Sequence, residues 1–348
     1  MELIELAEQG FIPDFLIRKG IRNLLQARLK SEWRGTEEAT QQSLQGFFHE
    51  LSKSPIALRT SDSKDQHYEV PTEFFLQTLG PRLKYSSCYY ASRRSGLAEA
   101  EEAMLGLTCE RAALGNGMKI LELGCGWGSL SLWMAEKYPG SQITAVSHSK
   151  TQKRFIDERA QQRGLKNLTI ITQDMNDFEA QDRFDRVVSV EMFEHMRNWP
   201  ELFRRVARWL KPDGKFFMHV FCHKRLAYFF EDQGSDNWMG RYFFSGGLMP
   251  SRDMPFQFNA DLGVTHHWVV DGRHYAQTSE DWLKMMDSHR EAILASFDQH
   301  YGPEARRWFN RWRIFFMACA ELFDFNDGQE WFVGHYLLSP HSASRQQN

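Results

Sequence analysis

The sequence contains little cysteine, and no two of its cysteines are close together. Five of the 348 residues are cysteine: Cys88, Cys109, Cys125, Cys222 and Cys319. Their odd number, their wide spacing and the lack of any Cys-x-x-Cys pair argue against a disulfide framework and against structural zinc. We therefore expect reduced thiols and a cytoplasmic protein.

The chain also lacks a long apolar run and an excess of charge of either sign. No stretch approaches the ~20 apolar residues of a membrane-spanning helix, and the acidic start has no basic region typical of a signal peptide. With 42 basic and 45 acidic residues, the net charge of −3 shows no electrostatic footprint for nucleic acid. Nothing in the sequence selects between a monomer and a homodimer.

The most informative stretch that is present runs from residue 119 to residue 137. Residues 120–123 are mostly apolar and predict a short buried strand. Gly124, Gly126 and Gly128 follow at alternate positions, and an apolar helix then extends to Lys137. A strand, a glycine turn and a helix allow the backbone to approach a ligand closely at the edge of a parallel sheet.

The glycine spacing and the residue before it separate two kinds of cofactor. Dinucleotide sites favour Gly-x-Gly-x-x-Gly, whereas this chain has Gly-x-Gly-x-Gly, so a nicotinamide dehydrogenase is the poorer candidate. Glu122 stands at the strand end, where a carboxylate suits a ligand with an ammonium group. S-adenosylmethionine carries an ammonium and a sulfonium. The pattern resembles the first motif of class I methyltransferases, although any turn between a strand and a helix can be rich in glycine.

Strands and helices alternate beyond residue 119, which predicts a parallel sheet with right-handed crossovers. The expected strands are 119–123, 143–146, 168–171, 184–190 and 215–220, with 331–337 returning to the sheet edge. The expected helices are 99–107, 130–137, 152–163, 201–210, 278–298 and 303–323. We predict an α/β fold with a Rossmann-like class I methyltransferase sheet in residues 65–348, preceded by an N-terminal helical region in residues 1–64.

Two segments outside this alternation have distinctive compositions. Residues 1–30 predict short helices, whose stripe of Arg and Lys we interpret as a solvated face rather than a membrane contact. Residues 221–275 are rich in aromatic residues and are interrupted by Gly and Pro, which predicts a partly irregular cap over the strand ends. Its rings, including Trp238 and Phe244, either line a cleft for an aromatic amine or pack against the sheet. His266, His267 and His274 lack the spacing of metal ligands, so no metal is expected.

Three segments together carry a more specific resemblance. They are Leu-Glu-Leu-Gly-Cys-Gly-Trp-Gly at 121–128, Val-Ser-Val-Glu-Met-Phe-Glu-His-Met at 188–196, and the segments His67-Tyr68-Glu69 and Tyr85-Ser86. They resemble the cyclopropane-fatty-acid-synthase superfamily of class I methyltransferases, and within it the plant coclaurine N-methyltransferase-like enzymes. The resemblance implies N-methylation of a small aromatic amine, of the phenylalkylamine or benzylisoquinoline type, in alkaloid biosynthesis.

The resemblance also implies which residues bind S-adenosylmethionine. Tyr85 and Ser86 approach its methionine end together with Glu122, Gly124 and Gly126; Asp174 and Met175 hold the adenine. Many class I enzymes have an acidic residue for the ribose after the second strand, but this chain has Ser147-His148-Ser149. The Gln152 amide can bond the same diol, so Ser147 and Gln152 complete the expected set.

The expected catalytic group follows the fourth strand. Glu191, Glu194 and His195 are spaced i, i+3 and i+4, so on a helical turn they converge on one face. Methyl transfer to an amine needs an unprotonated nitrogen, and a Glu194–His195 pair is a reasonable general base. Glu191 and Glu69 can hold the ammonium, and Tyr68 lies in the same polar segment, expected as a lid. Helix-dipole complementation is the structural alternative for the acidic cluster.

The main alternative function is fatty-acyl cyclopropanation, which the same superfamily performs with bicarbonate as base. In that branch Cys, Glu, His and Tyr hold the bicarbonate; here Ser87 replaces the cysteine, while Glu194, His219 and Tyr275 match the other ligands. A one-residue shift brings Cys88 to the first position. Residues that border the substrate are expected to include Trp238, Phe244, His219, Tyr275, Trp331 and Phe332, although core packing explains the last two equally well. A cofactor-binding scaffold without catalysis is a further alternative.

Overall fold

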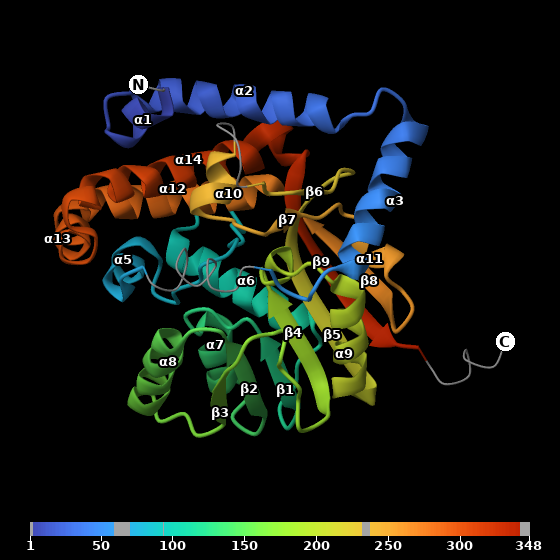
Figure 1. Ribbon diagram of the computed structural model, residues 1–348. Helices are drawn as coiled ribbons and strands as arrows, with labels where there is room; N and C mark the ends of the chain where they lie inside the picture. The colour runs from blue at the N-terminus through green and yellow to red at the C-terminus, as the bar shows by residue number, and fades with distance from the viewer. Residues whose placement is uncertain (1–2, 59–69, 93, 232–236, 342–348) are drawn as a thin grey trace.

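The central element of the fold is a twisted sheet whose carboxyl edge lies under a layer of helices (Figure 1). The computed structural model describes residues 3–58, 70–92, 94–231 and 237–341. In these residues seven strands form one sheet in the order β3-β2-β1-β4-β5-β9-β8. The strands are β1 (Lys119–Leu123), β2 (Gln142–Ser147), β3 (Leu168–Thr172), β4 (Phe184–Val190), β5 (Leu210–His223), β8 (Leu262–Val270) and β9 (Trp331–Pro340). The predicted α/β sheet is confirmed.

The position of the last strand was predicted incorrectly. Strand β9 runs antiparallel between β5 and β8, so β8 forms the sheet edge instead. Residues 221–275 are therefore not only a cap, because their last third supplies β8 to the central sheet. The sequence of β8 is a mixture of Val, Thr, His and Trp, and most of its residues are only half-buried or exposed. Such a strand lacks the continuous apolar run that marks the buried strands of a parallel sheet.

Helices cover both faces of the sheet because neighbouring residues of each strand point to opposite sides. Ile120, Val188 and Phe217 pack in one core with α6 and α7, whereas Leu121 and Val187 pack in a second core with α3 and α9. Helix α8 packs beside α7 against β2 and β3. The bounds are α3 (Glu37–Lys53), α6 (Leu97–Arg111), α7 (Ser129–Lys137), α8 (Lys150–Gln162) and α9 (Trp199–Trp209).

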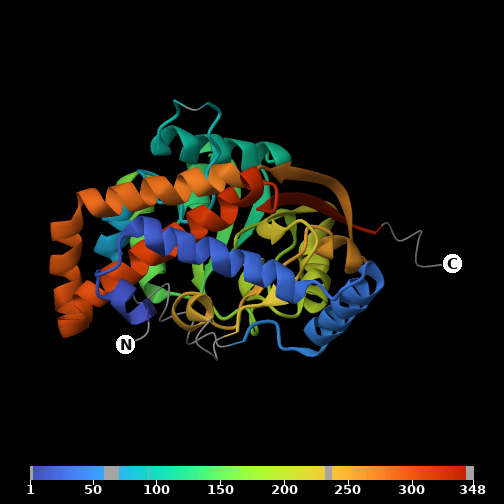
Figure 2. The ribbon, with the colours of Figure 1, turned by 90° about the horizontal axis from the view of Figure 1, so that it is seen from above.

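A third layer lies across the carboxyl ends of the parallel strands, where α2 crosses above α12 and α14 (Figures 1 and 2). Its large aromatic and aliphatic core joins these helices to α5 and to the segment around β6 and β7. The elements are α1 (Leu3–Glu8), α2 (Asp14–Glu32), α5 (Thr72–Thr78), β6 (Tyr228–Phe229), α10 (Trp238–Tyr242), β7 (Leu248–Met249), α11 (Met254–Gln257), α12 (Gly272–Ser288), α13 (Arg290–Tyr301) and α14 (Ala305–Gly328).

The expected solvated basic stripe on α2 is wrong for part of that helix. Arg18 forms ion pairs with Glu280 of α12, at 2.6 Å, and Glu321 of α14, at 3.1 Å. Arg22 also reaches Glu321, at 2.6 Å. The stripe therefore fastens α2 to the helices beneath it. None of the helices in the described ranges combines the length and apolar character needed to cross a membrane.

Candidate active site

The loop after β1 has a backbone that requires glycine. Gly124, Gly126 and Gly128 have φ of 79°, 51° and 80°, in the left-handed region where a side chain is strained. A Cβ on Gly124 would lie 2.8 Å from Met192, and one on Gly128 would lie 2.7 Å from Ile156. A Cβ on Gly126 would meet nothing within 4 Å. Gly124 and Gly128 thus allow close packing, whereas Gly126 borders the cavity next to the loop.

That cavity lies between the carboxyl ends of the strands and the helices above them. Its volume is about 1590 Å³, more than the roughly 300–1,000 Å³ typical of a site for one small ligand. It has room for a cofactor and a second molecule together. The predicted site residues that line it are Tyr85, Ser86, Glu122, Gly124, Gly126, Gln152, Asp174, Met175, Glu191, His195, Trp238, Phe244 and Tyr275.

One end of the cavity, next to the glycine loop, is polar. Glu122 is buried, accepts a hydrogen bond from the Ser131 hydroxyl, and has its pKa raised to about 7 by burial. Ser147 is buried behind Gln152 and does not line the cavity; its hydroxyl donates to Gln152 Oε1 at 2.8 Å. Ser147 therefore orients the Gln152 amide, which borders the cavity.

Unused hydrogen-bond donors at this end fit a polar cofactor. Trp127 Nε1, Ser129 Oγ and Thr108 Oγ1 are buried in residues that line the cavity, and they have no hydrogen-bond partner among the described residues. Buried polar atoms without partners are rare, and a ligand is one way to satisfy them. Donors for a carboxylate, together with the Glu122 carboxyl for an ammonium, fit the methionine end of S-adenosylmethionine.

Glu191 lies at the centre of the site and is held by donors from several segments. Its carboxylate accepts hydrogen bonds from the Ser87 amide at 2.9 Å, His219 Nε2 at 3.0 Å and the Tyr275 hydroxyl at 2.6 Å. Its φ of 48° is left-handed, which turns the side chain off the strand direction. Burial raises the pKa of Glu191, while the Lys84 ammonium and the Tyr275 hydroxyl oppose the shift.

Glu194 has a different environment from that of Glu191. Its side chain is fully buried and Oε1 accepts a hydrogen bond from the Phe221 amide at 2.7 Å. Oε2 has no partner in the part of the chain that the structure describes. Burial and the neighbouring Glu191 raise the pKa of Glu194 well above its usual range. Because Glu191 accepts more hydrogen bonds than Glu194, the negative charge is more favourable on Glu191.

Lys84 is a buried cation beside this pair that the sequence reasoning missed. Its Nζ donates to Ser86 Oγ and, at 2.7 Å, to the Ser87 carbonyl, and burial lowers its pKa. A charged residue directly before Tyr85-Ser86, within an otherwise uncharged segment that runs to Tyr90, was the available signal. Lys84 holds the segment whose Ser87 amide donates to Glu191.

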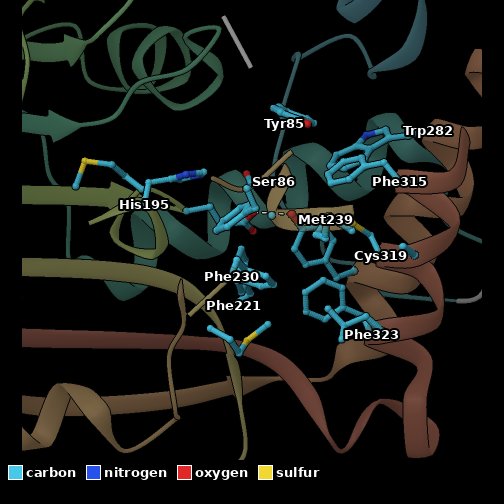
Figure 3. A pocket seen from close by; sticks show the side chains of 18 of the residues that line it. Tyr85, Ser86, His195, Phe221, Phe230, Met239, Trp282, Phe315, Cys319 and Phe323 are labelled. Carbon is cyan, nitrogen blue, oxygen red and sulfur yellow. Dashed lines mark hydrogen bonds between the residues drawn. The ribbon is translucent and has the colours of Figure 1, made fainter. Parts of the chain in front are cut away.

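The predicted convergence of Glu191, Glu194 and His195 does not occur on a regular helical face. The turn is a short 3₁₀ helix, Phe193–His195, and Glu191 precedes it in the left-handed conformation. His195 borders the cavity (Figure 3). The centre of its ring lies 4.3 Å from that of Phe244. His219, on β5, places an imidazole Nε2 3.0 Å from the Glu191 carboxylate.

The other expected residues separate into those that border the cavity and those that do not. Tyr275, Trp238 and Phe244 line it, whereas His219 is fully buried behind Glu191. Trp331 and Phe332 are buried on β9 and do not line the cavity, so core packing explains them. Tyr68 and Glu69 lie outside the described residues.

Aromatic side chains from distant segments also line the cavity. Figure 3 shows Phe221 and Phe230 facing Phe315 and Phe323 across the cavity, with Trp282 near Tyr85. The ring of Phe323 stacks on Tyr275 at 4.2 Å. The sequence predicted helices over the segments of Trp282, Phe315 and Phe323, but it did not assign these rings or the apolar face of α2 to the site. Among the described residues, no group of His, Cys, Asp and Glu could hold a metal.

Comparison with known proteins agrees with this geometry. The family model described as mycolic acid cyclopropane synthetase matches residues 57–331. The chain is 39% identical to (S)-coclaurine N-methyltransferase of Thalictrum flavum subsp. glaucum, over 97% of this chain and 95% of the relative. It is 33% identical to cyclopropane-fatty-acyl-phospholipid synthase of Escherichia coli K12, over 77% of this chain and 66% of the relative.

A solved structure shares almost the whole fold. It is coclaurine N-methyltransferase bound to N-methylheliamine and S-adenosylhomocysteine, with a TM-score of 0.93, 35% identity, and coverage of 97% of this chain and 98% of that one. The demethylated cofactor in that structure agrees with the polar end of the cavity described above. The chain therefore belongs to the mycolic acid cyclopropane synthetase family, and within it is an S-adenosylmethionine-dependent amine N-methyltransferase similar to the coclaurine N-methyltransferases.

Proposed function

We propose that the amine substrate is aromatic, of the phenylalkylamine or benzylisoquinoline type. The observation that carries the proposal is that the Glu191 carboxylate lines the same cavity as several aromatic side chains, with the fully buried Glu194 close to it in sequence. One net negative charge on the pair matches one alkylammonium. Aromatic faces such as those of Phe221 and Phe230 stabilise a cation when water is excluded. The similarity to coclaurine and pavine N-methyltransferases supports the same substrate class.

The Glu191 carboxylate is proposed to hold the ammonium, and His195 to accept its proton. S-adenosylmethionine supplies an electrophilic methyl group, so the amine nitrogen must present a free lone pair. His195 borders the cavity and is packed on Phe244. Glu194 is proposed to be protonated, which makes it a poor base and moves the general-base role from the expected Glu194–His195 pair to His195. Tyr68 and Glu69 remain proposed lid residues.

The geometry disfavours the lipid alternative. The Ser87 segment, His219 and Tyr275 are three of the positions that hold bicarbonate in the cyclopropane branch. Here the Ser87 amide, His219 Nε2 and the Tyr275 hydroxyl all donate to the Glu191 carboxylate instead. Glu191 occupies these three donors, so they are not available to a bound anion. Its negative charge also repels such an anion.

The test is transfer of a labelled methyl group from S-adenosylmethionine to two panels, one of aromatic and aliphatic amines and one of unsaturated phospholipids. We expect label on aromatic amines, most strongly on benzylisoquinolines, and none on lipid. His195→Ala should lower turnover on the order of a hundredfold, as loss of a general base does, with unchanged affinity for S-adenosylhomocysteine. Label in lipid alone, or in aliphatic amines alone, contradicts the proposal; an equal loss of turnover and cofactor affinity in His195→Ala contradicts the base.

A further inference from the structure

Behind Glu191, polar side chains continue across the sheet in a line. In the strand register, Val190 of β4 pairs with His219 of β5, and His219 pairs with His335 of β9. Arg111, the last residue of α6, reaches this line from the far side. These residues come from segments far apart in sequence, and neither Arg111 nor His335 lines the cavity. Both histidine side chains are fully buried, whereas Arg111 is half-buried.

Hydrogen bonds join the line end to end. Arg111 lies 2.8 Å from His335 Nδ1, His335 Nε2 lies 2.9 Å from His219 Nδ1, and His219 Nε2 lies 3.0 Å from Glu191 Oε1. The Arg111 guanidinium also lies over the Trp268 ring, with its carbon 5.2 Å from the ring centre. That contact holds the guanidinium in place.

The two ends of the line fix the direction of every hydrogen bond. A guanidinium only donates and an ionised carboxylate only accepts. His335 Nδ1 must therefore accept, which leaves the His335 proton on Nε2. His219 Nδ1 must accept in turn, so the His219 proton is also on Nε2 and is donated to Glu191. Burial lowers the pKa of both histidines well below the usual range, in agreement with neutral rings.

We propose that Arg111 and His335 are positioning residues of the active site, which hold His219 in the Nε2–H tautomer and so keep a donor on the Glu191 carboxylate. The proposal rests on the proposed function in that Glu191 is taken to hold the substrate ammonium. The line is not a path for the substrate proton. Outward transfer would require both rings to reverse, and His335 would then donate toward Arg111, which has no acceptor.

Other groups also form hydrogen bonds or electrostatic interactions with Glu191, and substitution of Arg111 does not remove them. Hydrogen bonds to Glu191 come from the Ser87 amide and the Tyr275 hydroxyl as well as from His219. The titratable groups that face or electrostatically couple to Glu191 are Lys84, Cys88, Glu194, His219, Tyr275 and Cys319. Removing Arg111 leaves all of them in place. It takes away one cation and one of the two ends that fix the imidazole tautomers.

The first experiment reads the tautomers without using activity. Isotope-labelled histidine nitrogens are observed by NMR in the full-length protein with S-adenosylhomocysteine added. We expect Nε2–H for both His219 and His335 in the wild type and in Glu191→Gln, where Arg111 alone fixes the direction because an amide can donate or accept. In Glu191→Gln combined with Arg111→Ala neither end fixes the direction, so we expect a mixture of tautomers, and Glu191→Gln combined with Arg111→Lys should keep the wild-type pattern, since an ammonium also only donates. Two Nε2–H rings that persist unchanged in the Glu191→Gln, Arg111→Ala variant overturn the proposal, as does an Nδ1–H ring in the wild type.

The second experiment measures amine methylation against pH. In Arg111→Ala a cation is lost, and the two rings can reverse when Glu191 is protonated, so the charged form of Glu191 is disfavoured. The acid limb of kcat/KM should therefore move to higher pH, and kcat/KM at neutral pH should fall on the order of tenfold. Arg111→Lys should restore most of this, and Arg111→Ala combined with His335→Phe should be no worse than His335→Phe alone. The matched control is Arg186→Ala, because half-buried Arg186 donates to the carbonyls of Ala112 and Ala113 beside Arg111.

The two experiments separate failure of the proposal from failure of the proposed function. If Arg186→Ala shifts the pH profile as much as Arg111→Ala does, the effect is structural and the positioning role is refuted. An additive loss in the double variant also refutes it. If the wild type methylates no aromatic amine, the proposed function fails, while the tautomer measurement still decides whether Arg111 fixes the two rings.

Discussion

At the scale of single residues, the site separates two carboxyl groups by the donors that each receives. Glu191 accepts hydrogen bonds from Ser87, His219 and Tyr275, whereas Glu194 accepts one from the Phe221 amide and has an oxygen with no partner among the described residues. Burial raises the pKa of both, and the neighbouring Glu191 raises that of Glu194 further. The hydrogen-bond donors therefore favour the negative charge on Glu191 over Glu194.

This division predicts different outcomes for two substitutions of equal size. Glu191→Gln removes the charge and should lower kcat/KM for the amine on the order of a hundredfold. Glu194→Gln replaces a group that is already neutral and should lower kcat/KM less than about tenfold. Affinity for S-adenosylhomocysteine, measured by calorimetry, should stay unchanged in both, because neither group is part of the polar end. Equal losses of kcat/KM would show that the charge is shared between the two carboxyls.

At the scale of elements, the roof of the cavity depends on a buried contact between α1, α10 and α14. Glu8 of α1 accepts hydrogen bonds from Trp238 Nε1 at 2.8 Å and from Arg311 at 3.0 Å. Both charged side chains are less than a tenth exposed. Trp238 lines the cavity, so this contact fixes a substrate-facing ring as well as the end of the N-terminal helices.

Glu8→Ala should therefore weaken both folding and substrate binding. Removing one partner of a buried pair leaves Arg311 uncompensated, which costs about 3–5 kcal/mol of unfolding free energy. We expect KM for the amine to rise while cofactor affinity is kept, in measurements of chemical unfolding, kinetics and calorimetry. The control is Glu304→Ala, whose pair with Arg307 at 3.0 Å is on the surface and should contribute no more than about 1 kcal/mol. An unchanged KM would restrict Glu8 to a structural role.

Elements with local signals could be predicted from the sequence, whereas those defined by distant pairing could not. The strand β1, its glycine loop and α7 are encoded within residues 119–137, so their structure and their place at the site followed from apolar pattern and glycine spacing. Strand β8 was missed because an edge strand needs only partial burial. The Glu191–His219–His335 line depends on the register of β4, β5 and β9, which periodicity within one segment does not specify.

At the scale of the whole molecule, buried titratable groups make stability depend on pH in two opposite ways. Burial lowers the pKa of His219, His223 and His335, so unfolding lets these rings take up protons. Burial raises the pKa of Glu122, so unfolding at neutral pH releases a proton from this carboxyl. The histidines destabilise the fold as pH falls, and Glu122 destabilises it as pH rises through about 7. The net slope is the difference between these contributions.

The contribution of His223 can be isolated because it lies away from the cavity. His223 Nε2 bonds to Glu330 at 3.0 Å, and burial outweighs that carboxylate and lowers the pKa of the ring from 6.5 to about 4. Between these pH values the unfolded state binds a proton that the folded state does not, so stability is lost as pH falls through 6.5 toward 4, by about 1.4 kcal/mol per pH unit.

His223→Gln should be less stable than the wild type at pH ~7, because Gln packs less well. The difference in unfolding free energy between the wild type and His223→Gln, measured by urea unfolding, should narrow by roughly 2 kcal/mol at pH ~5. A His223→Gln curve that runs parallel to the wild-type curve over this pH range would contradict the lowered pKa of His223.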